Sequence, residues 1–116
     1  MPHGLSQETV DKLRRLFARF EKVEEVILYG SRAKGNFRPG SDVDLTLKGE
    51  GLDLQLLNKI SRDIDDLLLP YAFDISIFRQ IKNQELLDLI DRVGVIFYRR
   101  VSGSTIRGEK KFPTNQ

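Results

Sequence analysis

Two aspartates separated by one residue, at the start of an apolar run, restrict this 116-residue chain more than any other feature. Asp42 and Asp44 lead into Leu45-Thr46-Leu47, a pattern that predicts a strand over about residues 43–48. Side chains at positions i and i+2 of a strand point to the same face, so the two carboxylates would project together from a sheet. Val43 and Leu45 would then anchor the opposite face in the core.

A third aspartate lies inside another apolar segment. Residues 72–78 predict a strand in which Phe73 and Ile75 share one face and Asp74 lies on the other. An unpaired aspartate in so apolar a strand is unfavourable unless it is solvated, paired or bound to a metal. Three carboxylates on one face of neighbouring strands would repel one another. Mg²⁺, which prefers carboxylate and phosphate oxygens, would relieve that repulsion.

A glycine–serine pair ends the apolar run of a strand predicted over residues 25–29. Residues 31–34 can form one helical turn, and its free N–H groups and the Ser31 hydroxyl suit an anion. Gly30 would let phosphates approach the backbone closely. Arg32, Lys34 and Arg38 add positive charge where a triphosphate would lie. Neither a P-loop nor the dinucleotide-binding glycine pattern is present.

Each of these parts has a simpler interpretation when it stands alone. Asp42 and Asp44 fit turn and cap positions around Pro39-Gly40, and Asp74 fits a solvated or salt-bridged strand position. Gly30 fits an ordinary turn glycine beside a loop of solvated cations. The joint arrangement favours a metal-dependent nucleotide site instead.

The remaining periodicity predicts helices over about residues 6–21, 53–68 and 83–93, and a short last strand over residues 95–98. Ser6 and Asp53 are the expected N-caps of the first two helices. The resulting order of elements predicts an α/β or α+β domain, with a small sheet flanked by helices, over residues 1–100. Parallel and antiparallel pairing stay open. Residues 101–116 lose periodicity and are expected to form a flexible tail.

Composition narrows the class of protein. Hydrophobic content of 40% and charged content of 31% are typical of a soluble globular domain, and the lack of cysteine excludes disulfides and thiolate metal sites. The net charge of +2 arises in the last sixteen residues, from Arg107, Lys110 and Lys111 against Glu109, so no direct nucleic-acid binding is expected. No apolar run reaches membrane-spanning length and no signal peptide is evident, so we expect a cytoplasmic protein.

The pair Gly30-Ser31, a gap of ten residues, Asp42-x-Asp44 and the later Asp74 together resemble the DNA polymerase β-type nucleotidyltransferase superfamily. The form LYGSRAKG…GSDVDL is most similar to its minimal nucleotidyltransferase (MNT) branch, and the resemblance covers about residues 6–98. It implies a mixed sheet flanked by helices, NTP binding and two Mg²⁺ ions.

The same resemblance implies transfer of a nucleoside monophosphate from an NTP to a hydroxyl, with release of pyrophosphate. Asp74 would also help to deprotonate the acceptor hydroxyl, and Gly30 and Ser31 would contact the β- and γ-phosphates. The implied metal-binding set is Asp42, Asp44 and Asp74, and the predicted phosphate-binding set is Gly30, Ser31, Arg32 and Lys34.

Larger members of the superfamily hold the acceptor in a second domain, which residues 101–116 are too few to form. Another chain would therefore hold the acceptor. Minimal members are commonly encoded beside a HEPN-domain protein, as the antitoxin of a toxin–antitoxin pair. The resemblance implies transfer of AMP from ATP to a tyrosine of that partner, which silences its RNase activity.

Two other functions stay open at this point. The chain could be a non-catalytic nucleotide-binding module that inhibits its partner by occlusion, or a nucleotidyltransferase for a small molecule such as an aminoglycoside. A contact patch for a partner could include apolar residues that otherwise fill the core, namely Leu56, Leu69, Tyr71 and Leu87.

Overall fold

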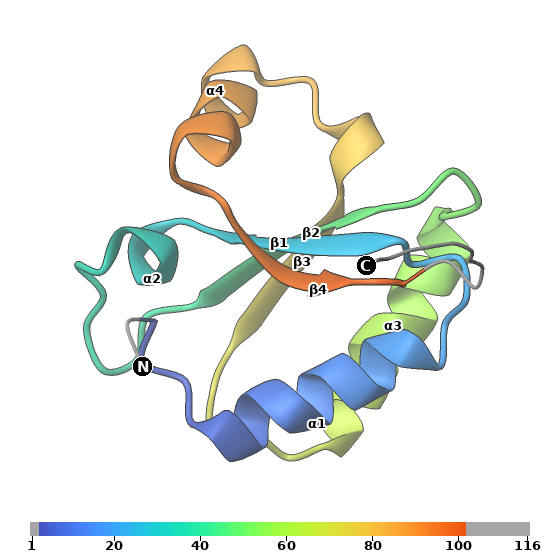
Figure 1. Ribbon diagram of the computed structural model, residues 1–116, viewed down its shortest axis with the longest axis horizontal. Helices are drawn as coiled ribbons and strands as arrows, with labels where there is room; N and C mark the ends of the chain where they lie inside the picture. The colour runs from blue at the N-terminus through green and yellow to red at the C-terminus, as the bar shows by residue number, and fades with distance from the viewer. Residues whose placement is uncertain (1–2, 102–116) are drawn as a thin grey trace, which may run out of the picture.

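The computed structural model describes residues 3–101 (Figure 1). Its elements are α1 (Gln7–Ala18), β1 (Glu25–Tyr29), α2 (Ser31–Lys34), β2 (Val43–Lys48), α3 (Leu54–Asp66), β3 (Phe73–Ile77), the 3₁₀ turn η1 (Phe78–Gln80), α4 (Gln84–Val93) and β4 (Val95–Arg99). The predicted order of helices and strands is confirmed. The predicted tail lies, except for Val101, outside the described residues. None of the described helices is both long enough and apolar enough to cross a membrane.

The four strands form one mixed sheet in the order β3-β2-β1-β4. Strand β1 pairs antiparallel with both β2 and β4, whereas β2 and β3 run parallel. The sequence left the direction of pairing open, and the observed mixture agrees with the sheet that the family resemblance implies. The parallel pair needs a crossover, which α3 supplies.

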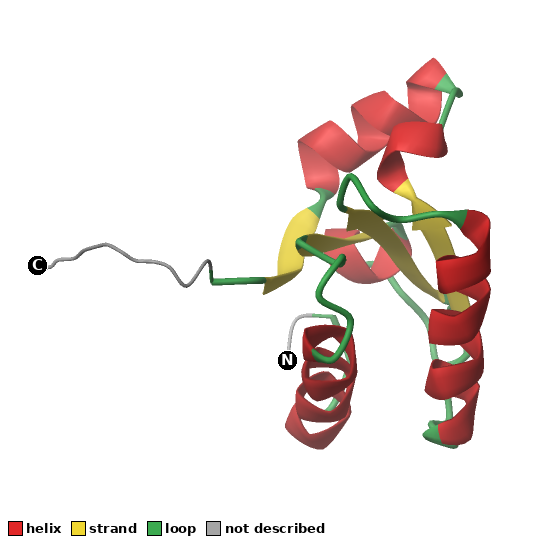
Figure 2. Ribbon diagram, turned by 90° about the vertical axis from the view of Figure 1, so that its right-hand side faces the viewer, coloured by secondary structure: helices red, strands yellow, loops and turns green. Residues whose placement is uncertain are grey.

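Two layers of helices enclose the sheet unequally. Helices α1 and α3 cover one face, and α4 covers part of the other (Figures 1 and 2). The main core lies under α1 and α3, and its strand residues include Val26, Leu28, Val43, Leu45, Leu47 and Ile77. Leu56, Leu69 and Tyr71 are half-buried against this core, so they fill it more than they offer a contact patch.

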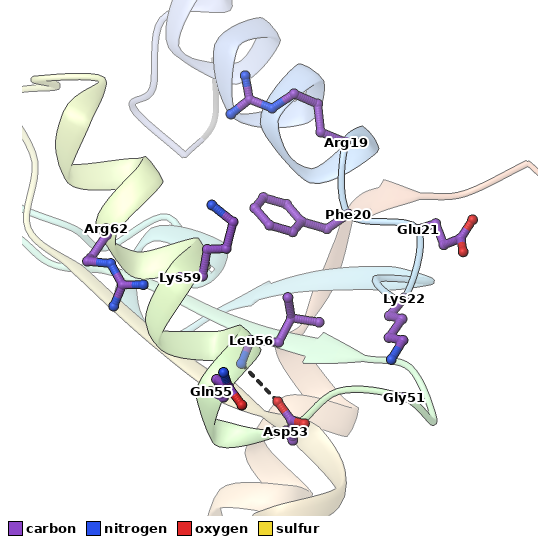
Figure 3. Close-up of a pocket in the computed structure, with 10 residues that line it drawn as sticks. All are labelled: Arg19, Phe20, Glu21, Lys22, Gly51, Asp53, Gln55, Leu56, Lys59 and Arg62. Carbon is purple, nitrogen blue, oxygen red and sulfur yellow. Dashed lines mark hydrogen bonds between the residues drawn. The ribbon is translucent and has the colours of Figure 1, made fainter.

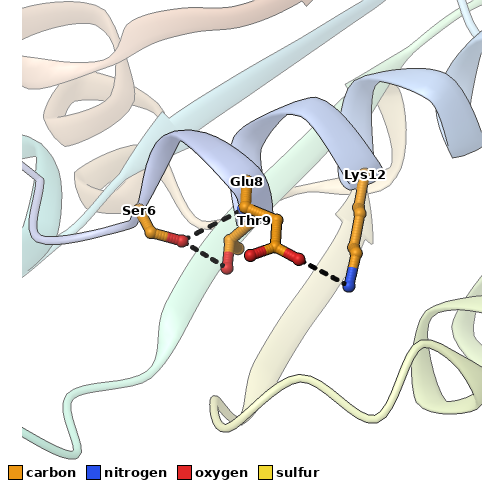
Figure 4. A network of polar contacts seen from close by, with 4 residues as sticks. All are labelled: Ser6, Glu8, Thr9 and Lys12. Carbon is orange, nitrogen blue, oxygen red and sulfur yellow. Dashed lines mark hydrogen bonds and ion pairs between the residues drawn. The ribbon is translucent and has the colours of Figure 1, made fainter.

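The helix ends follow from local chemistry. Ser6 Oγ accepts a hydrogen bond from the Thr9 backbone N–H at 3.1 Å and donates to Thr9 Oγ1 at 3.0 Å, and Glu8 pairs with Lys12 one turn later (Figure 4). Asp53 accepts from the Leu56 backbone N–H at 2.8 Å. Both predicted N-caps are therefore confirmed, and each satisfies an N–H group that the helix itself leaves without a partner.

Two helices end earlier than the sequence predicts. Helix α1 ends at Ala18 and not at residue 21, and the Arg100 guanidinium donates to the carbonyl oxygens of Ala18 and Phe20 at 3.1 and 2.8 Å. Helix α3 ends at Asp66 and not at residue 68, because Leu68 adopts a left-handed backbone with φ of 55°. A residue in that conformation cannot continue a right-handed helix.

Candidate active site

The predicted carboxylates meet in one row across the sheet. Asp44 on β2 is the register partner of Asp74 on β3, and on its other side it is the partner of Tyr29 on β1. Asp42 precedes Asp44 by two residues and lies just before β2 begins. Residues in register on neighbouring strands project from the same face, so the row brings Tyr29, Asp44 and Asp74 together.

The row lies on the face of the sheet opposite to α1 and α3. Val43 and Leu45, the neighbours of Asp44 in the chain, are both fully buried in the main core. Alternation along β2 therefore directs Asp44 to the other face, as predicted. Asp44 is half-buried, whereas Asp42 and Asp74 are exposed. The site is thus an open sheet surface with its innermost carboxylate at the centre.

Like charge accumulates on this surface. Burial raises the pKa of Asp44 above its usual range, and the carboxylates of Asp74 and Asp42 raise it further. None of the ion pairs formed within residues 3–101 includes any of the three aspartates. Among the described residues, the three carboxylates therefore repel one another without an ion-pair partner to offset the repulsion.

The carboxylates suit Mg²⁺ in kind but do not form a complete site by themselves. All are oxygen donors, and they are close enough for Asp44 to sense both of the others. Within the described part of the chain, no three His, Cys, Asp or Glu side chains converge in a way that could hold a metal ion. An ion bound here would complete its coordination with phosphate or water oxygens, as Mg²⁺ commonly does.

Gly30 is favoured by its backbone conformation and by the carboxylate next to it. Its backbone adopts φ of 78° and ψ of −157°, a combination open to glycine almost alone. A Cβ atom placed on Gly30 would overlap Asp44 Oδ2. The sequence pointed to close approach of a phosphate as the reason for glycine, and the structure adds close approach of Asp44.

Helix α2 is a single turn that begins directly beside this carboxylate. The Lys34 N–H bonds to the Gly30 carbonyl at 3.1 Å, and the Gly35 N–H bonds to the Ser31 carbonyl at 3.0 Å. Gly35 ends the turn in the left-handed conformation. The first N–H groups of such a turn have no partner within it, which leaves them available to an anion. Ser31 is half-buried at this end and Lys34 is exposed.

Arg32 is held differently from the other predicted phosphate contacts. It is 3% exposed, and its guanidinium donates to the Ser41 carbonyl through Nε at 3.1 Å and Nη2 at 3.0 Å, and to the His3 carbonyl through Nη1 at 2.9 Å. The guanidinium carbon of Arg32 lies over the rings of Phe37 and Tyr71, 5.1 and 5.2 Å from their centroids. Its side chain holds the 35–42 loop in place. Only the backbone N–H of Arg32, in the first turn of α2, is therefore left for a phosphate.

Three hydroxyl groups on the same face were not among the predicted site residues. Ser76 Oγ donates to Thr46 Oγ1 at 3.0 Å, and Thr46 is fully buried. Tyr29 is 7% exposed. Burial raises the pKa of its phenol, the polar side chain of Ser76 lowers it, and the Asp74 and Asp44 carboxylates raise it further. Strand alternation places Tyr29 on this face, and its alignment with Asp44 depends on sheet pairing.

A hollow of about 590 Å³ lies elsewhere, between the α1–β1 connection and the first half of α3 (Figure 3). Phe20 and Leu56 line it together with several charged side chains, including Arg19, Lys59 and Arg62. Asp63 pairs with Arg19 at 3.8 Å and with Lys59 at 3.9 Å. The hollow contains none of the predicted site residues, so the candidate chemistry belongs to the open sheet face.

A mixed sheet with a glycine–serine turn beside a row of aspartates defines a nucleotide-transferring domain. The family model described as "Polymerase beta, Nucleotidyltransferase" matches residues 11–102. The chain therefore belongs to the polymerase beta nucleotidyltransferase family, which confirms the resemblance drawn from its motifs. No curated protein matches the chain.

Solved structures share this fold. A toxin–antitoxin structure with AMP-PNP is 20% identical, with a TM-score of 0.63 and coverage of 83% of this chain and 75% of the other. The structure of a tri-AMPylated Shewanella oneidensis HEPN toxin with an MNT antitoxin is 16% identical, with a TM-score of 0.61 and coverage of 83% and 74%. An MntA–HepT toxin–antitoxin structure is 16% identical, with a TM-score of 0.60, and the match covers 82% of this chain and 74% of the other. At such identities the likeness establishes the fold.

Proposed function

We propose that this nucleotidyltransferase transfers AMP from ATP to a tyrosine hydroxyl of a HEPN-domain protein and so acts as the antitoxin of that partner. The observation that carries the proposal is the row of Asp44 and Asp74, with Asp42 beside it, next to the Gly30-Ser31 turn. Two of the structures that share the fold add support, since one holds AMP-PNP and another holds a tri-AMPylated HEPN toxin with its MNT antitoxin.

Asp42, Asp44 and Asp74 are the residues that would hold two Mg²⁺ ions, with the triphosphate completing the coordination. Mg²⁺ bound there supplies neutralising charge for the triphosphate and for the pyrophosphate that leaves. The three aspartates carry no ion pairs of their own within the described residues, so their oxygens are available for this role.

The turn at Gly30 is the proposed cradle for the β- and γ-phosphates. Gly30 leaves room beside Asp44, and the N–H groups at the start of α2 and the Ser31 hydroxyl can donate to phosphate oxygens. Exposed Lys34 adds a mobile positive charge at the end of the same turn. The role of Arg32 is to fix the loop that leads to Asp42, with its backbone N–H as its contribution to the cradle.

Asp74 is the proposed base for the acceptor. It lies on β3, which is an edge strand of the sheet, and its side chain is exposed. An acceptor hydroxyl carried by a second protein can therefore approach it from outside the sheet. The carboxylate takes the hydroxyl proton as the oxygen attacks the α-phosphorus, and the bond to the β,γ-pyrophosphate breaks on the opposite side.

The test is transfer of label from α-³²P-ATP to the protein encoded beside this chain, with Mg²⁺ and with EDTA as the blank. We expect labelled partner, loss of its RNase activity, and no transfer by Asp44→Asn at unchanged folding. Binding of ATP by the wild-type protein without any labelled partner would overturn the proposal. Neutralisation of the toxin by Asp44→Asn would instead establish inhibition by occlusion, and transfer to an aminoglycoside alone would establish a small-molecule enzyme.

A further inference from the structure

Helix α3 is followed by a strained and exposed leucine. Leu68 has φ of 55°, and within residues 3–101 every other positive φ belongs to a glycine. It comes directly after the C-cap Leu67, at the position where glycine usually ends a helix because a side chain is strained there. The Leu68 side chain is 88% exposed, so burial does not compensate for the strain. Strained residues cluster at binding and active sites, which makes Leu68 a candidate contact for a partner.

The charges around Leu68 are also unfavourable for the free chain. Asp65 and Asp66 are exposed in the last turn of α3, which contains no basic residue. Carboxylates are disfavoured at this end of a helix because the macrodipole is negative there. Neither aspartate forms an ion pair with any side chain of residues 3–101. A protein surface with an apolar pocket and a basic rim would complement this end of the helix.

The surface beside Leu68 continues to the proposed base. Half-buried residues of the connection from α3 to β3 (Figure 1) pack against the core, and they are Leu69, Tyr71 and Phe73. The residues between them are exposed and form an apolar strip of Leu68, Pro70 and Ala72. The next exposed residue in this alternation is Asp74. Six residues extend over at most about 20 Å, whereas a protein interface of about 800 Å² per partner is about 30 Å across, so one interface covers both.

The connection that carries the strip is fixed to the rest of the site. The Val43 N–H donates to the Ala72 carbonyl at 2.8 Å, at the point where β2 and β3 begin. The Tyr71 ring lies against the Arg32 guanidinium, which in turn holds the 35–42 loop. A protein seated on the strip would therefore take a defined position relative to the carboxylate row.

We propose that the apolar strip, with Leu68 at its outer end, is the docking site for the protein that brings the acceptor hydroxyl to Asp74. This inference rests on the proposed function. The partner surface that fits has an apolar pocket for the leucine and basic residues opposite Asp65 and Asp66. A second copy of this chain fits less well, because a two-fold contact at Leu68 would bring the same carboxylates together from both sides.

The experiment uses the protein encoded beside this chain as the acceptor. Leu68→Gly and Leu68→Ala both remove the apolar side chain, but only glycine also relieves the strain. Leu54→Ala is the matched control, because Leu54 is 63% exposed at the first position of α3, about 20 Å along the helix from Leu68. Initial rates of AMP transfer are measured against acceptor concentration and against ATP concentration. Association and dissociation of the two proteins are followed separately, and thermal melting reports stability.

We expect Leu68→Gly and Leu68→Ala each to raise the KM for the acceptor protein about 10–100-fold, the effect of losing one buried leucine side chain. The KM for ATP and the kcat should not change, and Leu54→Ala should leave all three values unchanged. Leu68→Gly should also raise the melting temperature by about 4 °C, because the strain is relieved. Binding and stability then change in opposite directions, which a purely structural role of Leu68 would not produce.

The basic rim is tested by replacing Asp65 and Asp66 together with asparagine. Association should become slower and less dependent on salt, while dissociation changes little. Unchanged association in this double variant would overturn the basic rim of the partner.

Other results would overturn the docking site itself. A wild-type KM for the acceptor in Leu68→Gly would do so while leaving the proposed function intact, and so would an equal rise in Leu54→Ala. A wild-type dimer that becomes monomeric in Leu68→Gly, measured by light scattering, would make a second copy the occupant instead. Failure of the wild-type protein to label the acceptor would overturn the proposed function, and this inference with it.

Discussion

Replacing Gly30 with alanine should both strain the backbone and displace the central carboxylate. The φ and ψ of Gly30 fall in a region that costs a residue with a side chain about 1–3 kcal/mol. The added Cβ would also overlap Asp44 Oδ2, and residues in such contact couple by about 0.5–3 kcal/mol. For a domain of this size, each kcal/mol lowers the melting temperature by about 4–8 °C.

A double-mutant cycle separates the two effects. Asp44→Ala removes the atom that the new Cβ would meet, so Gly30→Ala should cost less in that background than in the wild type. Gly35→Ala is the matched control: its φ is 86° but a Cβ added there would meet no atom within 4 Å, so only backbone strain of about 1–2 kcal/mol is expected. Urea denaturation of all the variants gives the free energies of unfolding.

The double-mutant cycle can contradict the explanation given for Gly30. If Gly30→Ala costs the same with and without the Asp44 carboxylate, the two residues are not in contact and the explanation of Gly30 is wrong. If Gly30→Ala also leaves AMP transfer intact, then the position of Asp44 does not control the chemistry. Gly35→Ala checks that a loss of transfer does not follow from destabilisation alone.

Four further outcomes are expected. The folded-state pKa of Asp44 is raised above its unfolded pKa of 3.8. Its contribution to the stability of the ligand-free protein is therefore present below pH 3.8 and is lost as the pH rises through the folded-state pKa. Asp44→Asn should remove this pH-dependent loss of stability, which urea denaturation across acidic pH measures. Arg32→Ala should lower the free energy of unfolding by about 2–3 kcal/mol, with Arg32→Lys recovering only part of it, and equal stability of Arg32→Ala and wild type would contradict the tethering role. Arg100→Ala should cost about 1–2 kcal/mol and speed hydrogen exchange in the last turn of α1, since the guanidinium bonds to the carbonyls there. Ser31→Ala should raise KM for ATP about tenfold with kcat little changed, the size of one hydrogen bond to a charged group, and an unchanged KM would remove Ser31 from the cradle.

Local patterns were enough to predict most elements of this fold. Ser6 and Asp53 mark helix starts because their side chains satisfy N–H groups only a few residues away. Alternation in β3 separates Asp74 from its apolar neighbours because strand geometry repeats every two residues. The direction of strand pairing was not predictable in the same way, because it depends on crossovers and packing that no short segment encodes.

The charged residues of the site could be predicted from the sequence, but the contacts that hold them in place could not. Arg32 looked like a phosphate contact because of its charge and its place after Gly30. Its burial depends on the carbonyls of His3 and Ser41 and on two aromatic rings, which separate parts of the chain supply. The alignment of Tyr29 with Asp44 and Asp74 likewise needs the register of three strands. Residue type indicated what a side chain could bind, but only tertiary structure decided what it does bind.

The same arrangement explains why the ligand-free site is electrostatically unfavourable and why it suits its proposed substrate. Burial and two like charges raise the pKa of Asp44, and Arg32, the nearest arginine to Gly30 in the chain, has its guanidinium held by carbonyl oxygens elsewhere. Within residues 3–101, none of the three aspartates has an ion-pair partner, and under the proposed function metal ions that arrive with the nucleotide would neutralise the row. An arginine paired with Asp44 would stabilise the free protein but would occupy the oxygens that Mg²⁺ needs. Under the proposed function, stability given up at the carboxylate row would be recovered when metal and ATP bind.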